Sequence, residues 1–380
     1  MNSESMVVLW IAGPPGVGKT TVAREIWSRM SAAGIPTAYV NVDQLGMSMP
    51  APPGDPDRHG VKAAGLAAVV PGYRFAGARC LVMCGVVDTE RAREHAAKVA
   101  GADVVLCQLR LDPDELRDRL RSRDWDDEQI ASALNDAASL DRKAVGDIHI
   151  DTTGMSVTEV VGRVHEVLGG WPGTGVITPP EEEPMPATAA GSVTWLCGVT
   201  GVGKSTVGWQ TFMQLLRQDT SAAFVDLEQI GFIESASTDG PIDHPLRAHN
   251  LAALWQSFHA GGARHLVVTG EVSEPDQLRR YREALPAAGM SVIRLDASLP
   301  QLRDRILKRG RGEGWRIPGD RLKGRDSTEL NEIAESAAAD ALQLAEQGLG
   351  DLAIDTDHKS VTDIANTVLD AVTRSRDDSP

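Results

Sequence analysis

Short apolar runs alternate along this chain with longer stretches whose apolar residues recur at helical spacing. The runs predict strands, and the stretches between them predict helices. In the first half the predicted strands are 7–11, 37–42, 80–84, 104–109 and 148–150, and the predicted helices are 19–33, 62–75, 114–123 and 157–168. Because the strands are apolar throughout, they indicate a parallel sheet that is covered by helices on both faces.

The sequence then repeats itself about 185 positions further along. Corresponding residues include Trp10 and Trp195, Gly18-Lys19-Thr20-Thr21 and Gly203-Lys204-Ser205-Thr206, and Gly77-Ala78-Arg79 and Gly262-Ala263-Arg264. The offset grows to 204 where Asp151 corresponds to Asp355, and most of the added length lies between Arg309 and Leu352. A period of this length indicates two copies of one domain, the second with a larger insertion near its end.

This repeat sets the predicted domain organisation. Residues 1–170 and 192–373 are expected to form two α/β three-layer sandwiches with parallel central sheets. The stretch 171–191 is rich in Pro and Glu, which predicts a stiff, solvated linker. Residues 374–380 are expected to be a disordered tail.

Composition excludes several classes of function. Acidic residues outnumber basic ones by 53 to 38, and the net charge of −15 argues against a protein that coats nucleic acid. Aromatic residues make up only 4%, which disfavours grooves that stack bases. No apolar run approaches the roughly 18 residues of a membrane span, and no export signal begins the chain, so we expect a cytoplasmic protein without membrane contact. The oligomeric state is left open by the sequence.

Both copies carry a phosphate-binding loop of the form GxxxxGK[ST], at residues 13–20 and 198–205. In such a loop the glycines turn backbone N–H groups toward phosphate oxygens, the lysine reaches the β- and γ-phosphates, and the following hydroxyl residue ligates Mg²⁺. Each loop follows an apolar strand and opens a helix, which makes a turn without a ligand a poor explanation. The sequence thus predicts ATP and Mg²⁺ as cofactors. The expected nucleotide-binding residues are Gly13, Gly16, Gly18, Lys19, Thr20 and Thr21, with Gly198, Gly201, Gly203, Lys204, Ser205 and Thr206; Thr20 and Ser205 are the expected metal ligands.

With these loops, each copy resembles the small P-loop kinases, a group that includes nucleoside-monophosphate, gluconate, adenylylsulfate and polynucleotide kinases and chloramphenicol phosphotransferase. The resemblance implies a carboxylate after the second strand that orients or deprotonates the acceptor hydroxyl. Asp43 and Glu228 match that position, although Asp226 competes with Glu228. A carboxylate that only caps the next helix is the alternative for both residues.

The resemblance also implies a mobile lid whose arginines close over the phosphates. Arg119 and Arg123 match it in the first copy, and Arg305 and Arg309 in the second, where the lid is enlarged. Surface ion pairs within the helix are the alternative. On the acceptor side, the pairs His59/His244 and Lys62/Arg247 could bind an anionic or hydroxylated acceptor, and a solvated helix face explains them equally well.

These residues predict an ATP-dependent phosphotransferase whose partner is a small-molecule or nucleotide acceptor. Lys19, Asp43, Arg119, Arg123, Lys204, Glu228, Arg305 and Arg309 are its expected catalytic residues. One alternative is a nucleotide-dependent switch without a metabolite acceptor, and another is a polynucleotide-kinase-like enzyme that processes nucleic-acid ends. The sequence does not decide which acceptor is used, or whether one or both copies are active.

Overall fold

A computed structural model describes residues 5–86, 91–99, 101–169, 171–172, 185–234, 242–313, 320 and 322–377. The chain divides into two compact units. Unit 1 consists of Met1–Gly46, Gly54–Pro184 and Gln229–Leu246, and unit 2 of Met47–Pro53, Met185–Glu228 and Arg247–Pro380. Each unit therefore contains a short segment from the other half of the chain.

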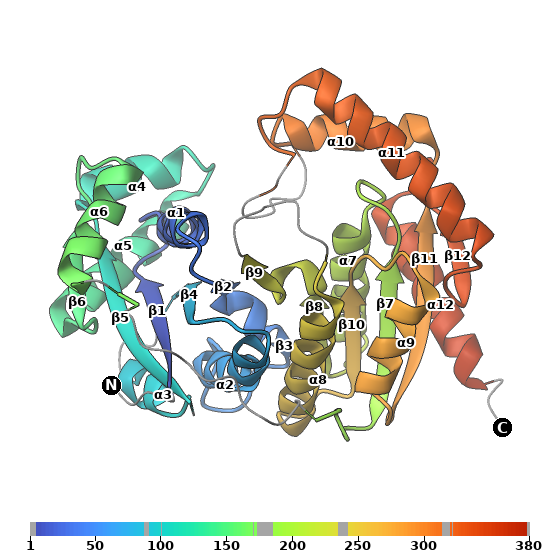
Figure 1. Ribbon diagram of the computed structural model, residues 1–380, viewed down its shortest axis with the longest axis horizontal. Coiled ribbons are helices and arrows are strands. Elements are labelled where there is room, and N and C mark those ends of the chain that lie inside the picture. The colour runs from blue at the N-terminus through green and yellow to red at the C-terminus, as the bar shows by residue number, and fades with distance from the viewer. Residues whose placement is uncertain are drawn as a thin grey trace. The chain divides into compact units, whose positions relative to one another are not determined.

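Unit 1 is built around β1 (Met6–Ala12) and β4 (Cys80–Cys84), two strands whose residues are all buried. Its elements from the first half are β1 (Met6–Ala12), α1 (Lys19–Ala32), β2 (Thr37–Asn41), the 3-10 helix η1 (Val42–Gly46), α2 (His59–Phe75), β4 (Cys80–Cys84), α3 (Ala92–Ala97), β5 (Ala102–Arg110), α4 (Pro113–Arg121), α5 (Asp127–Lys143), β6 (Ile148–Asp151) and α6 (Val157–Leu168) (Figure 1). The predicted strand at 80–84 and helix at 157–168 have the observed bounds.

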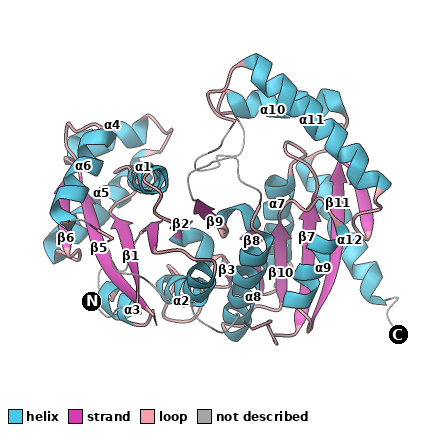
Figure 2. Cartoon of the chain, in the orientation of Figure 1, coloured by secondary structure: helices cyan, strands magenta, loops and turns pink. Residues whose placement is uncertain are grey.

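Unit 2 repeats this order of strands and helices. Its elements from the second half are β7 (Gly191–Cys197), α7 (Lys204–Arg217), β8 (Ala222–Asp226), the 3-10 helix η2 (Leu227–Gln229), most of α8 (His244–Ala260), β10 (His265–Thr269), α9 (Pro275–Ala284), β11 (Ala288–Asp296), α10 (Leu299–Gly310), α11 (Ser327–Glu346), β12 (Leu352–Asp355) and α12 (Val361–Asp377). In each unit helices flank the strands (Figure 2).

Each unit has one six-stranded sheet, and the two sheets share one strand order. The orders are β6-β5-β1-β4-β2-β9 and β12-β11-β7-β10-β8-β3, in which the last strands are β9 (Phe232–Glu234) and β3 (Ser48–Met49). The first five strands of each are parallel, but the sixth is antiparallel to its neighbour. The fold class is α/β as predicted, whereas the expected wholly parallel sheets are wrong, because an antiparallel edge strand makes each sheet mixed.

The edge strands are the segments that each unit takes from the other half. In unit 1, β9 (Phe232–Glu234) pairs with β2, with Phe232 opposite Tyr39. In unit 2, β3 (Ser48–Met49) pairs with β8, with Met49 opposite Ala222. Both edge strands follow the 3-10 helix that comes after the second strand of their own half. The same segment of each half therefore supplies the edge strand of the other unit.

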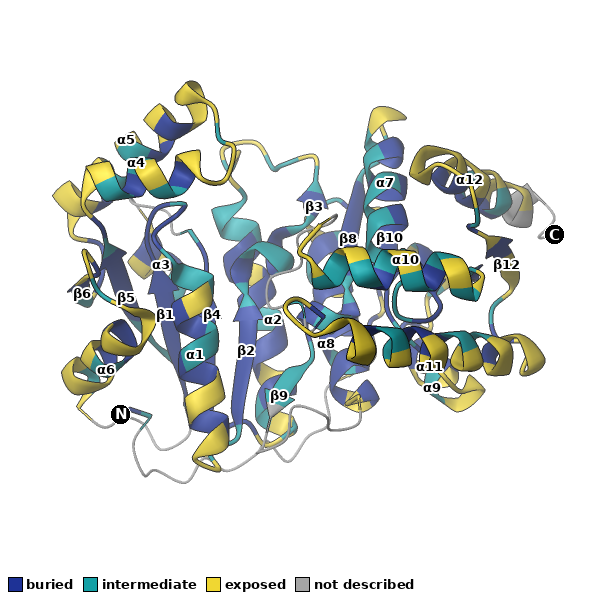
Figure 3. Ribbon diagram, turned by 90° about the horizontal axis from the view of Figure 1, so that it is seen from above, coloured by how far each residue is buried: buried dark blue, intermediate teal, exposed yellow. Residues whose placement is uncertain are grey.

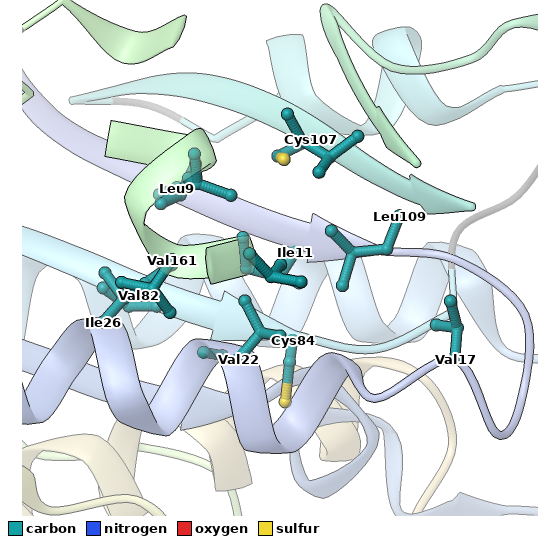
Figure 4. Close-up of a cluster of buried hydrophobic side chains, with 14 of the residues drawn as sticks. Leu9, Ile11, Val17, Val22, Ile26, Val82, Cys84, Cys107, Leu109 and Val161 are labelled. Carbon is teal, nitrogen blue, oxygen red and sulfur yellow. The ribbon is translucent and has the colours of Figure 1, made fainter. Parts of the chain in front are cut away.

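The core of unit 1 lies between β1, β4, β5 and the helices α1, α4, α5 and α6. Figure 3 shows that the strands are buried, whereas the helices expose one face. Figure 4 shows the side chains that meet on one side of the sheet, including Leu9, Ile26 and Val161. Val17 of the phosphate-binding loop belongs to the same cluster, so the loop is anchored in the core.

The ends of the predicted linker are packed. Trp171 joins the core of unit 1, while Ala187 and Ala189 are buried in unit 2, where the Trp255 indole donates a hydrogen bond to Ala189 O. Residues 173–184 lie outside the described part of the chain. The tail expected to be disordered from residue 374 instead continues α12 to Asp377, and 378–380 lie outside the described residues.

Candidate nucleotide-binding sites

The backbone of the two phosphate-binding loops is nearly the same in both units. Gly13, Gly16 and Gly18 have φ angles of 147°, 86° and 105°, and Gly198, Gly201 and Gly203 have 132°, 83° and 106°. These positive angles suit glycine, because a Cβ atom there would be strained. The glycine pattern in the sequence thus follows from the conformation that turns the loop.

Space around the first glycine of each loop is equally restricted. A Cβ at Gly13 would lie 2.7 Å from the carbonyl oxygen of Leu109, and one at Gly198 would lie 2.6 Å from that of Leu295. Both carbonyls belong to the strand that neighbours the first strand of the sheet. Each loop is therefore pressed against the carboxyl end of its sheet, where ligands bind in open α/β folds.

The helices that follow the loops begin without a side-chain cap. Gly18 and Gly203 are the N-cap residues of α1 and α7, and neither supplies a side-chain hydrogen bond to the first turn. By contrast, Asp126 and Ser156 cap α5 and α6 with capping boxes. Uncapped N–H groups at a helix start, together with the helix dipole, favour an anion.

Lys204 is buried and Lys19 is partly buried, and both loop lysines donate hydrogen bonds within their own loops. Lys19 Nζ lies 2.8 Å from Pro14 O, and Lys204 Nζ lies 3.0 Å from Val199 O. Burial lowers the pKa of Lys19 to about 8, an effect that the nearby Asp43 carboxylate partly offsets and Arg123 reinforces. Lys19 thus lies within electrostatic range of both Asp43 and Arg123.

In unit 1 the predicted base Asp43 lies in η1 and is held by two neighbours. Its backbone N–H donates to Asn41 Oδ1 at 3.0 Å, and its Oδ1 lies 2.9 Å from Lys62 Nζ. Thr20, the expected metal ligand, has its Oγ1 3.8 Å from Cys84 Sγ.

In unit 2 the carboxylate that contacts the loop is Asp226, not Glu228. Ser205 Oγ donates to Asp226 Oδ2 at 2.8 Å, and Glu228 N–H donates to Asp226 Oδ1 at 3.0 Å. Burial, followed by the charge of Glu228, raises the pKa of Asp226. The contact with the expected metal ligand therefore belongs to the residue that corresponds to Asn41 in unit 1.

Arg119 and Arg123, the arginines predicted to belong to a lid in unit 1, line a cavity of about 210 Å³ beside the phosphate-binding loop. Arg119 donates to Val17 O at 3.4 Å and pairs with Glu115 at 2.6 Å. Arg123 is exposed, and within the described chain its guanidinium makes no hydrogen bond or ion pair. The cavity is lined by Gly16, Val17, Gly18, Thr21, Val22, Arg119, Ser122, Arg123, Thr152, Met155, Val157 and Val160.

In unit 2, Arg305 makes the contact with the phosphate-binding loop that Arg119 makes in unit 1, and Arg309 is engaged elsewhere. Arg305 donates to Val202 O at 2.9 Å and to Thr356 Oγ1 and O, each at 3.0 Å, and its burial lowers the pKa of its guanidinium. Arg309 makes a two-point ion pair with Asp320, at 2.9 and 3.0 Å. Arg309 is thus paired with a carboxylate that belongs to the insertion of the second half.

Met155 and Val160 also line this cavity, but the sequence did not predict either of them as a site residue. Asp320 was also missed, because it lies in the insertion and has no counterpart in the first half.

Within the described residues, no group of three or more His, Cys, Asp or Glu could hold a metal ion. Among the described helices, none is long and apolar enough to cross a membrane.

Comparison with known proteins gives limited matches. A family model described as an AAA domain matches residues 9–141. No curated protein matches the chain.

Among solved structures, the chain is similar to the APS kinase CysC of Mycobacterium tuberculosis, with 21% identity over 48% of this chain and 98% of that one and a TM-score of 0.31. It is also similar to a gluconokinase from Sinorhizobium meliloti (16% identity, 49% and 93% coverage, TM-score 0.32) and to shikimate kinase from Bacteroides thetaiotaomicron (13%, 48% and 98%, 0.33). Matches this weak do not indicate a substrate, so the chemistry of the site must do so.

Proposed function

We propose that the protein is an ATP-dependent phosphotransferase built from two kinase-like units, which acts on a small-molecule or nucleotide acceptor. The observation that carries this proposal is the neighbourhood in unit 1, where the partly buried Lys19 of the phosphate-binding loop is within electrostatic range of Asp43 and Arg123, and where Arg123 lines the cavity beside that loop. A loop lysine, a carboxylate and a second cation are the parts that phosphoryl transfer needs, since the protein contributes mainly positioning and charge.

The residues present fit Mg·ATP in both units. The uncapped helix starts and positive-φ glycines suit phosphate oxygens. In unit 2, the hydroxyl of Ser205 and the carboxylate of Asp226 are adjacent oxygen donors, which Mg²⁺ prefers, and Thr20 supplies the hydroxyl in unit 1. When bound, the metal would neutralise charge on the phosphates. Lys19 and Lys204 would turn from their own loop carbonyls toward those phosphates.

The chain's own groups would then act in a defined order in unit 1. Asp43 would accept the proton of the acceptor hydroxyl while the acceptor oxygen forms its bond to the γ-phosphorus, and the bond from that phosphorus to the bridging oxygen of ADP breaks. Arg123, exposed and without a bonded partner in the described chain, would close over the transferred group. The cavity beside Arg119 and Met155 would hold the base of the nucleotide.

An ADP-release assay tests this proposal directly. ADP release would be measured with and without nucleosides, nucleotides, sugars and aminocyclitols, for the full chain and for Lys19→Ala and Lys204→Ala. Acceptor-stimulated release that Lys19→Ala abolishes is the expected result, and Lys98→Ala, which removes an exposed lysine of unit 1, should leave it unchanged.

Two results would contradict the proposal. ADP release that no acceptor stimulates would favour the nucleotide switch, and stimulation by polynucleotide ends alone would favour the end-processing enzyme. The comparison of the two lysine variants also tells whether one unit or both turn over.

A further inference from the structure

Lys62 is buried although it carries a charge. It lies on α2 with only 8% of its surface exposed, whereas the Asp43 side chain with which it pairs is 45% exposed. A buried ammonium is costly unless it is paired, so its contact with Asp43 at 2.9 Å compensates for the loss of solvation. The sequence left open whether Lys62 binds an acceptor or is simply solvated, and its burial excludes the second reading.

The packing of α2 against η1 provides room for this contact. A Cβ at Gly46 would lie 2.5 Å from Lys62 Cγ, so the lysine stem occupies the space of a side chain at that position. A Cβ at Gly65 would lie 2.4 Å from Leu45 O, so the helix and the 3-10 turn approach backbone to backbone. Both glycines are required for the close approach that brings Lys62 to Asp43.

Asp43 is consequently fixed on one side only. Asn41 holds its backbone N–H, Lys62 holds Oδ1, and no described residue forms a hydrogen bond with Oδ2. One carboxylate oxygen is thus anchored, and the other can meet a hydroxyl. The ammonium of Lys62 is already engaged with this carboxylate, and the surrounding protein covers it.

We propose that Lys62 is a positioning residue, which acts on the acceptor only through Asp43 and does not bind the acceptor itself. This inference rests on the proposed function, since it assumes that Asp43 is the general base of unit 1. It predicts that the loss of Lys62 affects the rate of transfer and leaves the affinities for ATP and acceptor unchanged. An acceptor ligand would behave in the opposite way.

A double-mutant cycle in the full chain tests the proposal, with unit 2 silenced by Lys204→Ala. Lys62→Met keeps the aliphatic stem and removes the charge. We expect kcat to fall about 10- to 100-fold with unchanged KM values, because a small misplacement of a catalytic group costs about that much. In an Asp43→Asn background, Lys62→Met should cause no further loss. Lys62→Arg should restore part of kcat, and Lys98→Met, which breaks an exposed ion pair with Glu94, serves as the matched control.

A second measurement does not depend on turnover. Hydrogen exchange of the peptide that contains η1 should accelerate at least several-fold in Lys62→Met and not in Lys98→Met. A raised acceptor KM, or losses that add in the double variant, would overturn the positioning role. Absence of acceptor-stimulated turnover in the parent protein would defeat the proposed function instead. In that case unchanged exchange at η1 would overturn the positioning role by itself.

Discussion

Phe232 lies in the second half of the chain, but its side chain packs in unit 1. Its ring centroid is 5.9 Å from those of both Trp27 and Tyr39, and the Arg24 guanidinium lies 5.7 Å from it. Burial of a phenylalanine is worth about 3–5 kcal/mol relative to alanine when the site is fully enclosed. Phe232 is half-buried, so we expect Phe232→Ala to destabilise the edge of the unit 1 sheet by about 2 kcal/mol.

Hydrogen exchange measured by mass spectrometry can locate this loss. Two kcal/mol corresponds to about a 30-fold faster exchange where local opening controls the rate. In Phe232→Ala we expect this acceleration in β2, which pairs with β9, and little change in β8. The sequence position of the substitution would suggest the reverse.

Met49→Ala is the matched control, because Met49 lies in the first half and packs on the cluster of Phe212 and Phe224 in unit 2. It should accelerate exchange in β8 and spare β2. If Phe232→Ala instead accelerates exchange in β8, or leaves β2 unchanged, the assignment of the edge strands is refuted.

Three further outcomes follow from the sites. Burial lowers the pKa of Lys19 to about 8, and a bound phosphate favours the charged form of the lysine, so nucleotide binding to unit 1 should take up a proton above pH 8 and weaken as the pH rises. Calorimetry in two buffers of different ionisation enthalpy would detect the proton uptake. Absence of this uptake would contradict the role of Lys19. Gly13→Ala should weaken nucleotide binding at least tenfold, because its Cβ would strike a backbone carbonyl, whereas Gly34→Ala, with positive φ but open space, should leave affinity unchanged in the same titration. Asp320→Ala should leave the half-buried Arg309 without its ion-pair partner, and should lower the free energy of unfolding of this part of unit 2 by about 3 kcal/mol in denaturant unfolding. A change below 1 kcal/mol would mean that the ion pair is as weak as one between exposed side chains.

The features that could be predicted from the sequence are those encoded locally. The glycine spacing of each loop reports backbone angles that few other residues adopt, and the apolar run 80–84 reports a strand buried on both faces. α5 is absent from the predicted helices, although Asp126 and Gln129 form a capping box at its start. Its buried positions are few, so apolar periodicity was weak and the cap was the better signal.

The exchange of edge strands could not be read from the sequence for a different reason. β3 has two residues and β9 has three, too few for any periodicity to appear. Moreover, the two halves follow the same pattern, so a short strand fits the edge of either sheet equally well by its own residues. The choice depends on the path of the chain after η1 and η2, which is a property of the whole fold.

The predicted lid arginines have the same spacing in both halves of the sequence but different surroundings in the two units. Arg123 and Arg309 correspond in the repeat and received the same predicted role, but Arg123 lies two residues beyond the end of α4 whereas Arg309 lies within α10. In the structure, Arg309 meets Asp320, a carboxylate whose side chain is only 9% exposed and which the first half lacks. A salt bridge of this kind is set by a partner eleven residues away in an insertion, not by the spacing within the helix. If Arg309 is to reach a phosphate, its ion pair with Asp320 must first open, a step that Arg123 of unit 1 does not require.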